Sequence, residues 1–113
     1  MAIDIEKIAF KIILYAGNAK SEAYKALNEA KQNNFENIEK YMNNAKDELN
    51  KAHNVQTELL AEEANGNTID LPIILVHAQD HLMTAISEIN LIKELIDCIL
   101  QIHKLKNFVS KKL

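Results

Sequence analysis

Apolar residues recur along this chain at three- and four-residue steps, the spacing that places them on one side of an α-helix. Three separate runs show this pattern, and they predict helices at about residues 4–32, 35–64 and 70–106. Asp4 is a good N-cap for the first helix, and Gly66 suits a left-handed end of the second. The pattern therefore predicts an all-α protein, an antiparallel three-helix bundle.

The first two runs differ in the kind and the spacing of their apolar residues. From Ala16 onward the stripe of the first helix thins to alanine, which permits a neighbouring helix to approach closely. The second run follows a heptad, which is typical of a helix packed nearly parallel or antiparallel to its neighbours. Its members are Phe35, Ile38, Met42, Ala45, Leu49, Ala52, Gln56 and Leu59. Gln56 is the one polar member, and with His53 we interpret it as a partly exposed pair at the edge of the polar seam described next.

The third helix is apolar around most of its circumference and carries one polar seam. At about 100° per residue, His77, Asp80, His81 and Thr84 fall on one narrow stripe. The seam is expected to face a cleft, a metal or a subunit partner, because buried polar groups need partners. Two neighbouring helices cannot cover so much apolar surface, so we expect self-association. Periodicity alone leaves dimer, trimer and tetramer open.

Composition narrows the class of protein. A length of 113 residues fits a single domain, spanning residues 1–113, and a hydrophobic content of 48% is enough for a core. Two glycines and one proline are too few for the turns of a many-stranded sheet. A net charge of -3 without a block of one sign predicts no binding to nucleic acid. All thirteen basic residues are lysines, so no arginine is present to clamp a phosphate with two hydrogen bonds.

The cysteine content and the N-terminal residues bear on the compartment. Cys98 is the only cysteine, and among apolar neighbours it is expected to be a small core residue. The first residues lack the apolar centre of a signal peptide, and no run reaches the length of a membrane span. These features predict a cytoplasmic protein without direct membrane insertion.

Several chemistries can be weighed for the polar seam. A zinc metalloprotease helix needs glutamate directly after its first histidine, and here Ala78 follows His77. Di-iron bundles need Glu-x-x-His pairs, which the chain lacks, and no glycine-rich phosphate loop or nucleophile-elbow serine occurs. Two interpretations remain open from the residues. One is a histidine nucleophile that attacks phosphorus; the other is a structural core histidine partnered by Asp80.

The string at residues 76–85, VHAQDHLMTA, resembles the signature of the lactose/cellobiose-type enzyme IIA of the bacterial phosphoenolpyruvate-dependent sugar phosphotransferase system. Two further stretches, IILYAGNAKS at residues 12–21 and AHNVQTEL at residues 52–59, resemble the first and second helices of that family. The resemblance thus covers nearly the whole chain. It implies three-helix subunits that assemble as a homotrimer.

The resemblance also implies roles for residues of the seam. His77 is expected to accept a phosphoryl group from phospho-HPr and to pass it to a cysteine of enzyme IIB, ahead of disaccharide uptake and phosphorylation. Asp80 matches an aspartate whose copies from three subunits surround a divalent cation, usually taken as Mg²⁺, on the trimer axis. His81 matches the motif and is given a supporting role. The protein would then be an enzyme, a phosphotransferase component that forms a phosphohistidine intermediate within a multi-protein system.

Two other classes of function are compatible with the pattern. One is a non-catalytic helical interaction module with structural histidines, and the other is a metal-binding regulator. Only the phosphocarrier interpretation predicts an acid-labile, base-stable modification on one histidine, whereas a regulator would bind stoichiometric metal without accepting a phosphoryl group. The sequence does not specify the sugar, so lactose, cellobiose, chitobiose and related disaccharides stay open.

Overall fold

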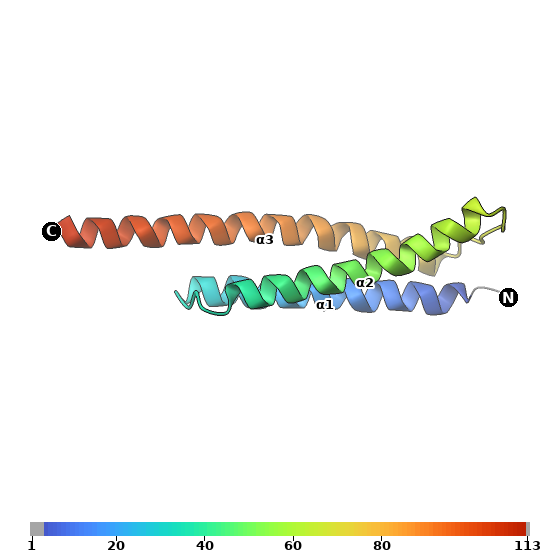
Figure 1. The fold of residues 1–113 in the computed structure, drawn as a ribbon, viewed down its shortest axis with the longest axis horizontal. Coiled ribbons are helices and arrows are strands. Elements are labelled where there is room, and N and C mark those ends of the chain that lie inside the picture. The colour runs from blue at the N-terminus through green and yellow to red at the C-terminus, as the bar shows by residue number, and fades with distance from the viewer. Residues whose placement is uncertain (1–3, 113) are drawn as a thin grey trace.

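The computed structural model describes residues 4–112 and shows three long helices: α1 (Ile5–Lys31), α2 (Ile38–Ala64) and α3 (Ile73–Lys112). Consecutive helices run in opposite directions, and the described part of the chain contains no strand (Figure 1). The particle is elongated, with extents of 69 × 21 × 17 Å. Both α2 and α3 pack along α1, and they contact one another far less. The predicted all-α architecture with antiparallel neighbours is confirmed, and a single chain does not test the homotrimer.

Helix α1 is closed at both ends by local hydrogen bonds. Asp4 is its N-cap, as predicted, because its Oδ1 accepts a hydrogen bond from the backbone N–H of Lys7 at 3.1 Å. At the other end Asn33 adopts a left-handed conformation with φ 62°, and the N–H of Asn34 donates to the carbonyl of Glu29 at 2.9 Å. This is the Schellman arrangement, which satisfies carbonyls that a helix end leaves free.

The start of α2 differs from the prediction for a physical reason. The predicted range began at about residue 35, but residues 33 and 34 belong to the left-handed turn that closes α1. Helix α2 therefore begins at Ile38, after a turn, and Asn37 occupies the N-cap without a side-chain hydrogen bond. The end of α2 agrees with the prediction, because Gly66 has φ 90° and follows the C-cap Asn65.

The start and the end of α3 also differ from the predicted range of about 70–106. A proline disfavours the helical conformation in the residue before it, and α3 accordingly begins at Ile73, with the carbonyl of Pro72 accepting from the N–H of Val76 at 3.3 Å. At its C-terminal end α3 continues to Lys112, with Lys111 and Lys112 in the last turn, where positive charge is favourable.

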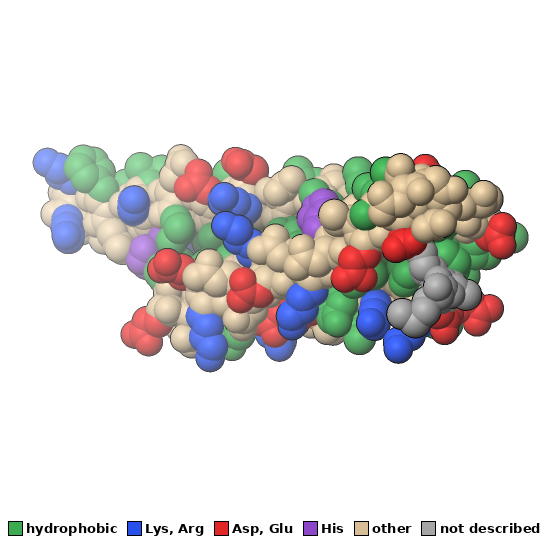
Figure 2. All heavy atoms as spheres, turned by 45° about the vertical axis from the view of Figure 1, so that its right-hand side comes forward, with side chains coloured by type: hydrophobic (Ala, Val, Ile, Leu, Met, Phe, Trp, Pro, Cys, Tyr) green, Lys and Arg blue, Asp and Glu red, His purple; other side chains and the backbone are tan. Residues whose placement is uncertain are grey.

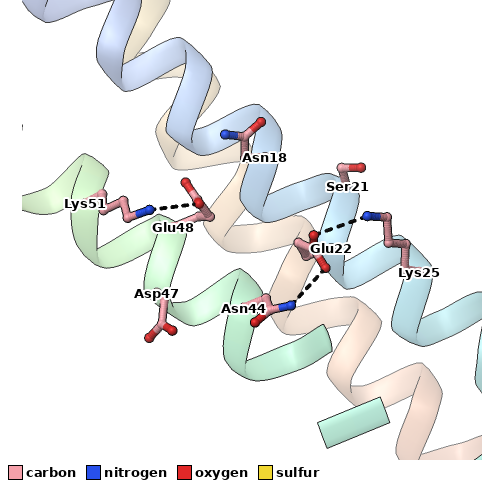
Figure 3. Close-up of a pocket in the computed structure, with 8 residues that line it drawn as sticks. All are labelled: Asn18, Ser21, Glu22, Lys25, Asn44, Asp47, Glu48 and Lys51. Carbon is pink, nitrogen blue, oxygen red and sulfur yellow. Dashed lines mark hydrogen bonds and ion pairs between the residues drawn. The ribbon is translucent and has the colours of Figure 1, made fainter. Parts of the chain in front are cut away.

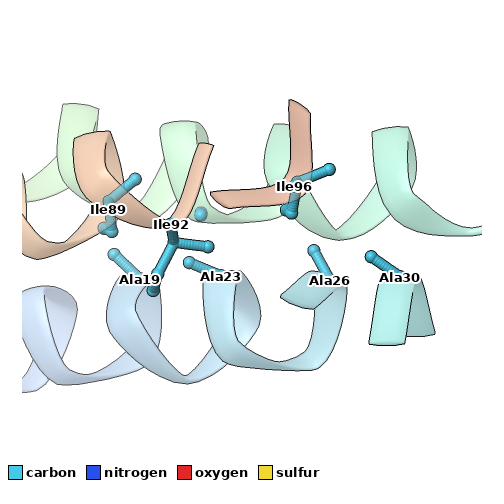
Figure 4. Packing of buried hydrophobic residues seen from close by; sticks show 8 residues of the cluster. Ala19, Ala23, Ala26, Ala30, Ile89, Ile92 and Ile96 are labelled. Carbon is cyan, nitrogen blue, oxygen red and sulfur yellow. The ribbon is translucent and has the colours of Figure 1, made fainter. Parts of the chain in front are cut away.

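Two clusters of buried residues hold α1 against its neighbours. In one, small residues of α1 face branched residues of α3 (Figure 4), as the alanine stripe predicted. This cluster contains Ala19, Ala23, Ala26, Ala30, Ala45, Ile89, Ile92 and Ile96. The other lies nearer the N-terminal end of α3 and includes Ile12, Leu75 and Leu82, the largest fully buried side chains. The core therefore runs along α1, and the opposite side of α3 is left uncovered.

The uncovered side of α3 forms one long line of exposed residues, which we term the α3 stripe. Its members follow one another at steps of three or four, the spacing of a helix seam that faces another helix. They are Ile73, His77, Asp80, Thr84, Ser87, Leu91, Leu95, Cys98, Ile102, Leu105 and Val109. Cys98 is therefore exposed, and the expectation that it is a core residue is wrong. None of the described helices is long and apolar enough to cross a membrane.

Candidate functional site

The two histidines of the seam form a directly contacting pair on the first turns of α3. Nε2 of His81 lies 3.1 Å from Nε2 of His77, and the ring centroids are 4.5 Å apart with an interplanar angle of 89°. Their four-residue separation produces this contact, because residues i and i+4 lie on one face of a helix. His77 is exposed and His81 is half-buried. A structural core histidine at position 77 is thus excluded for the single chain.

Asp80 and Thr84 lie on the same stripe but differ in their hydrogen bonding. The hydroxyl of Thr84 donates to the backbone carbonyl of Asp80 at 2.8 Å, so it is occupied within the helix. Asp80 itself is exposed, and its carboxylate accepts no hydrogen bond from another residue in the described part of the chain. The carboxylate therefore points to solvent on the side of α3 that α1 and α2 leave open.

The residues fit a shared metal site only when several chains contribute. Within residues 4–112 no group of three or more His, Cys, Asp or Glu side chains could hold a metal ion. On the α3 stripe each chain offers the exposed carboxylate of Asp80, and carboxylate oxygens are ligands that Mg²⁺ accepts. A cation on this side of α3 would require copies of Asp80 from neighbouring chains.

A polar contact joins α2 to the part of α3 that carries the histidines. Nε2 of Gln56 donates to Oε1 of Gln79 at 2.6 Å, which links α2 to α3 where the two helices otherwise meet little. Gln56 is half-buried, as expected for the edge of the seam, whereas His53 is exposed. His53 uses only its backbone carbonyl, which accepts from Thr57 at 2.9 Å.

A charged cluster further along the same side of α3 was not predicted from the sequence. The hydroxyl of Tyr24 donates to Glu88 Oε1, and Nζ of Lys20 lies 3.5 Å from Glu88 Oε2. The Tyr24 hydrogen bond, with a smaller contribution from Lys20, holds the pKa of Glu88 below its usual value, and the same bond raises the pKa of Tyr24. The partners are 64 residues apart in sequence, so only the tertiary structure reveals the cluster.

A polar groove between α1 and α2 lies apart from the histidines. It encloses about 480 Å³, and none of its lining residues belongs to α3 (Figure 3). Within it Glu22 bonds Lys25 and Asn44 at 3.2 and 3.4 Å, and Glu48 bonds Lys51 at 3.1 Å. The charges of the groove are thus largely paired with each other. We assign it no part in the chemistry of the histidine pair.

A contacting imidazole pair that is open to solvent at His77 has the chemistry of a carrier, because a ring nitrogen can hold a small electrophilic group. Comparison with known proteins makes the class specific. Residues 7–100 match the family described as the lactose/cellobiose-specific IIA subunit of the phosphotransferase system. The chain belongs to this family, and it is a phosphotransferase component with the role of a phosphocarrier.

Individual relatives agree with the family match. The chain is 42% identical over 94 residues to the lichenan-specific phosphotransferase enzyme IIA component of Bacillus subtilis, covering 83% of this chain and 86% of the relative. Its fold is similar to the crystal structure of the cellobiose-specific enzyme IIA from Bacillus anthracis, with a TM-score of 0.86, 41% identity and coverage of 92% and 95%. It is also similar to the IIA(chitobiose) chain solved in complex with HPr from Escherichia coli, with a TM-score of 0.78, 37% identity and coverage of 90% and 99%.

Proposed function

We propose that His77 is the residue on which this phosphocarrier holds its phosphoryl group, with phospho-HPr as the donor. The observation that carries the proposal is the exposed contact between Nε2 of His77 and Nε2 of His81. Solved complexes of IIA(chitobiose) with HPr support HPr as the partner, because this chain covers nearly all of that IIA chain. A donor protein needs an accessible nucleophile, and His77 meets that requirement.

The contact between the two rings suggests how His81 supports the transfer. Two neutral imidazoles with adjacent Nε2 atoms share one proton in that contact, because one ring donates and the other accepts. When His81 donates, Nε2 of His77 is the unprotonated nitrogen that accepts the hydrogen bond, and its lone pair attacks phosphorus as the N–H of His81 turns away from it. The new bond joins Nε2 of His77 to phosphorus as the bond between phosphorus and the donor breaks. The N–H of His81 is then available to the phosphoryl oxygens.

The onward step follows from family membership. The phosphoryl group is passed to a cysteine of enzyme IIB, which leads to phosphorylation of a disaccharide during its uptake. Such a carrier works in the cytoplasm, where HPr and enzyme IIB can both reach His77. The range of sugars in the names of relatives, from lichenan and lactose to diacetylchitobiose, leaves the sugar open.

We also propose that the chain works as a homotrimer with the α3 stripes facing a common axis. The exposed apolar members of the stripe support this, since Leu91, Leu95 and Ile102 are each more than half exposed in the single chain. Asp80 lies on the same stripe, so three copies would converge on the axis. Three carboxylates at close range repel strongly, and a divalent cation such as Mg²⁺ would neutralise them. In this site the cation would stabilise the trimer and take no part in phosphoryl transfer.

Phosphoryl transfer from purified components tests the proposed role of His77. The protein is incubated with phosphoenolpyruvate, enzyme I and HPr, and its intact mass is measured. We expect a gain of one phosphoryl group that is labile in acid and stable in base. The variant His77→Ala should show no gain, whereas the matched variant His53→Ala, which removes an exposed histidine of α2, should behave as the parent. Undiminished phosphorylation of His77→Ala would refute the assignment, and no phosphorylation of the parent would favour an interaction module.

A further inference from the structure

The connection between α2 and α3 carries the pair Asn65 and Gly66 at the point where α2 ends (Figure 1). Asn65 is the C-cap of α2, and it is the only asparagine of the sequence that is followed by glycine. Residues 63–68 are all exposed. Figure 2 turns this end of the molecule forward and shows tan atoms, which are backbone and uncharged polar side chains, with acidic side chains beside them. Water therefore reaches both residues of the pair.

The side-chain amide of Asn65 takes no part in holding the fold together. It makes no hydrogen bond to any described residue, and only the backbone N–H of Asn65 is bound, to the carbonyl of Ala61 at 3.0 Å. Asn67 differs, because its Nδ2 donates to Oε2 of Glu62 at 2.6 Å. A Cβ placed on Gly66 would meet no atom within 4 Å, so no neighbouring group crowds the glycine. The side chain of Asn65 is therefore free to turn toward the backbone nitrogen that follows it.

We propose that Asn65 is a site of spontaneous deamidation, at which the chain acquires aspartate or isoaspartate. The backbone nitrogen of Gly66, after loss of its proton, attacks Cγ of Asn65. A C–N bond forms, the bond between Cγ and Nδ2 breaks, and ammonia leaves after taking up a proton from water. Water then opens the succinimide ring: addition at Cγ gives aspartate, whereas addition at the backbone carbonyl carbon gives isoaspartate, in which the chain continues through the side chain. The net reaction consumes one water and releases one ammonia.

Ring closure requires rotation about the Cα–C bond of Asn65, and two hydrogen bonds of the helix end resist this rotation. The N–H of Gly66 donates to the carbonyl of Glu63 and the N–H of Asn67 donates to that of Glu62, both at 3.1 Å. They form the Schellman arrangement that closes α2. The end of a helix opens at little free-energy cost, and glycine has no side chain to obstruct the ring. The pair therefore reacts more readily than an asparagine in the interior of a helix.

The products change the end of α2 in two ways. Both add a negative charge beside Glu62 and Glu63, at the end of the helix where negative charge is unfavourable. Isoaspartate also inserts one more carbon into the backbone between residues 65 and 66, so the two Schellman hydrogen bonds lose their geometry. We therefore expect the last turn of α2 to open more often, together with the connection up to Ile69, which packs against the cluster that contains Leu75.

Peptide mapping by mass spectrometry tests the proposal on the full chain. The folded protein is incubated at mildly alkaline pH beside a synthetic peptide of residues 60–70. We expect conversion of amide to acid at residue 65 at a rate within about tenfold of the peptide, because the helix end opens readily. The rate should rise in proportion to hydroxide concentration, since the deprotonated nitrogen attacks. A folded protein that is unmodified at residue 65 when the peptide has been fully converted would overturn the proposal, as would equal conversion at Asn67.

Asn65→Gln is the matched variant, because glutamine would have to close a larger ring, which forms more slowly. It should abolish conversion at residue 65 and keep the urea midpoint of the parent. The control Asn54→Gln, at an exposed position within α2, should convert at residue 65 as the parent does. In the purified isoaspartate form, hydrogen exchange at the amides of Gly66 and Asn67 should be faster, and unchanged exchange would overturn the expected loss of the helix cap. None of these measurements uses phosphoryl transfer, so they are independent of the role of His77.

Discussion

Nε2 of His81 is 3.1 Å from Nε2 of His77, and the ring of His81 meets the ring of His77 edge to face. In this contact one ring donates its N–H and the other accepts it, so the two histidines have different protonation at Nε2. The exposed ring of His77 is open to a partner protein, whereas His81 is half-buried. The variants below test the consequences of this and of other contacts in the structure.

His81→Ala should slow phosphorylation by HPr by about fivefold, since it removes one hydrogen bond worth about 1 kcal/mol. The modification should remain on His77, which peptide mapping of the phosphorylated protein would show. His81→Gln keeps a side-chain N–H donor and should recover part of the rate. Label found on His81 in the parent protein would reverse the roles of the two histidines.

Asp80 offers a test of assembly by metal removal. If three Asp80 carboxylates share one cation, a chelator should loosen the trimer, as measured by sedimentation velocity. Asp80→Leu should then assemble without metal, because replacing a buried charged cluster by apolar residues is often neutral or stabilising by about 1–4 kcal/mol. A parent that stays equally trimeric in chelator, together with a variant that dissociates, would contradict the proposed axis.

The alanine face of α1 should not tolerate larger residues. Ala26 is fully buried in the cluster that joins α1 to α3 (Figure 4), and Ala26→Leu should lower the free energy of unfolding by about 1–3 kcal/mol through overpacking. The control Ala61→Leu lies on an exposed position of α2 and should change it by no more than about 0.5 kcal/mol. Urea unfolding followed by circular dichroism measures both, and equal values would show that the space between α1 and α3 accommodates the larger side chain.

The bond between Tyr24 and Glu88 should make stability depend on pH. The bond lowers the pKa of Glu88, so its contribution is present above the unfolded pKa of glutamate and is lost as pH falls through the lower folded value. It raises the pKa of Tyr24, so the contribution is present below the unfolded pKa of tyrosine and is lost as pH rises through the higher folded value. The difference in urea midpoint between the parent and Tyr24→Phe should therefore be largest near neutral pH.

The control for that series is Tyr41→Phe, which removes a hydroxyl on α2 away from Glu88. The difference in urea midpoint between Tyr41→Phe and the parent should vary less over the same pH range. A Tyr24→Phe difference that stays constant from acid to alkaline pH would show that the bond to Glu88 does not contribute to folding.

Features that depend on near neighbours in sequence could be predicted. The cap at Asp4, the left-handed Gly66 and the heptad of α2 each follow from a few adjacent residues, and the structure confirms them. The contact between His77 and His81 has the same origin, because a helix places residues four apart on one face. The ends of helices were less certain, because polar residues such as those at 31–34 can belong either to the turn that closes α1 or to the start of α2.

Features that depend on tertiary packing could not be predicted. The cluster of Tyr24 and Glu88 needs α1 and α3 to lie in a particular register, which no local pattern specifies. Cys98 sits among apolar neighbours in sequence, yet it lies on the side of α3 that faces away from α1. Apolar neighbours indicate burial only when the helix has a partner on that side, and a single chain provides α3 with a partner on one side alone.

The unbroken length of α3 has a geometric consequence for the proposed trimer. Its 40 residues extend about 60 Å, and His77 lies about 38 Å along the helix from Ile102. A three-fold rotation keeps all copies of α3 pointing the same way, so the proposed trimer would have two unlike poles, with the three His77 side chains near one and the three lysine-rich C-terminal ends of α3 at the other. α3 then acts as a rigid spacer. A partner protein bound at the His77 pole leaves the opposite pole free.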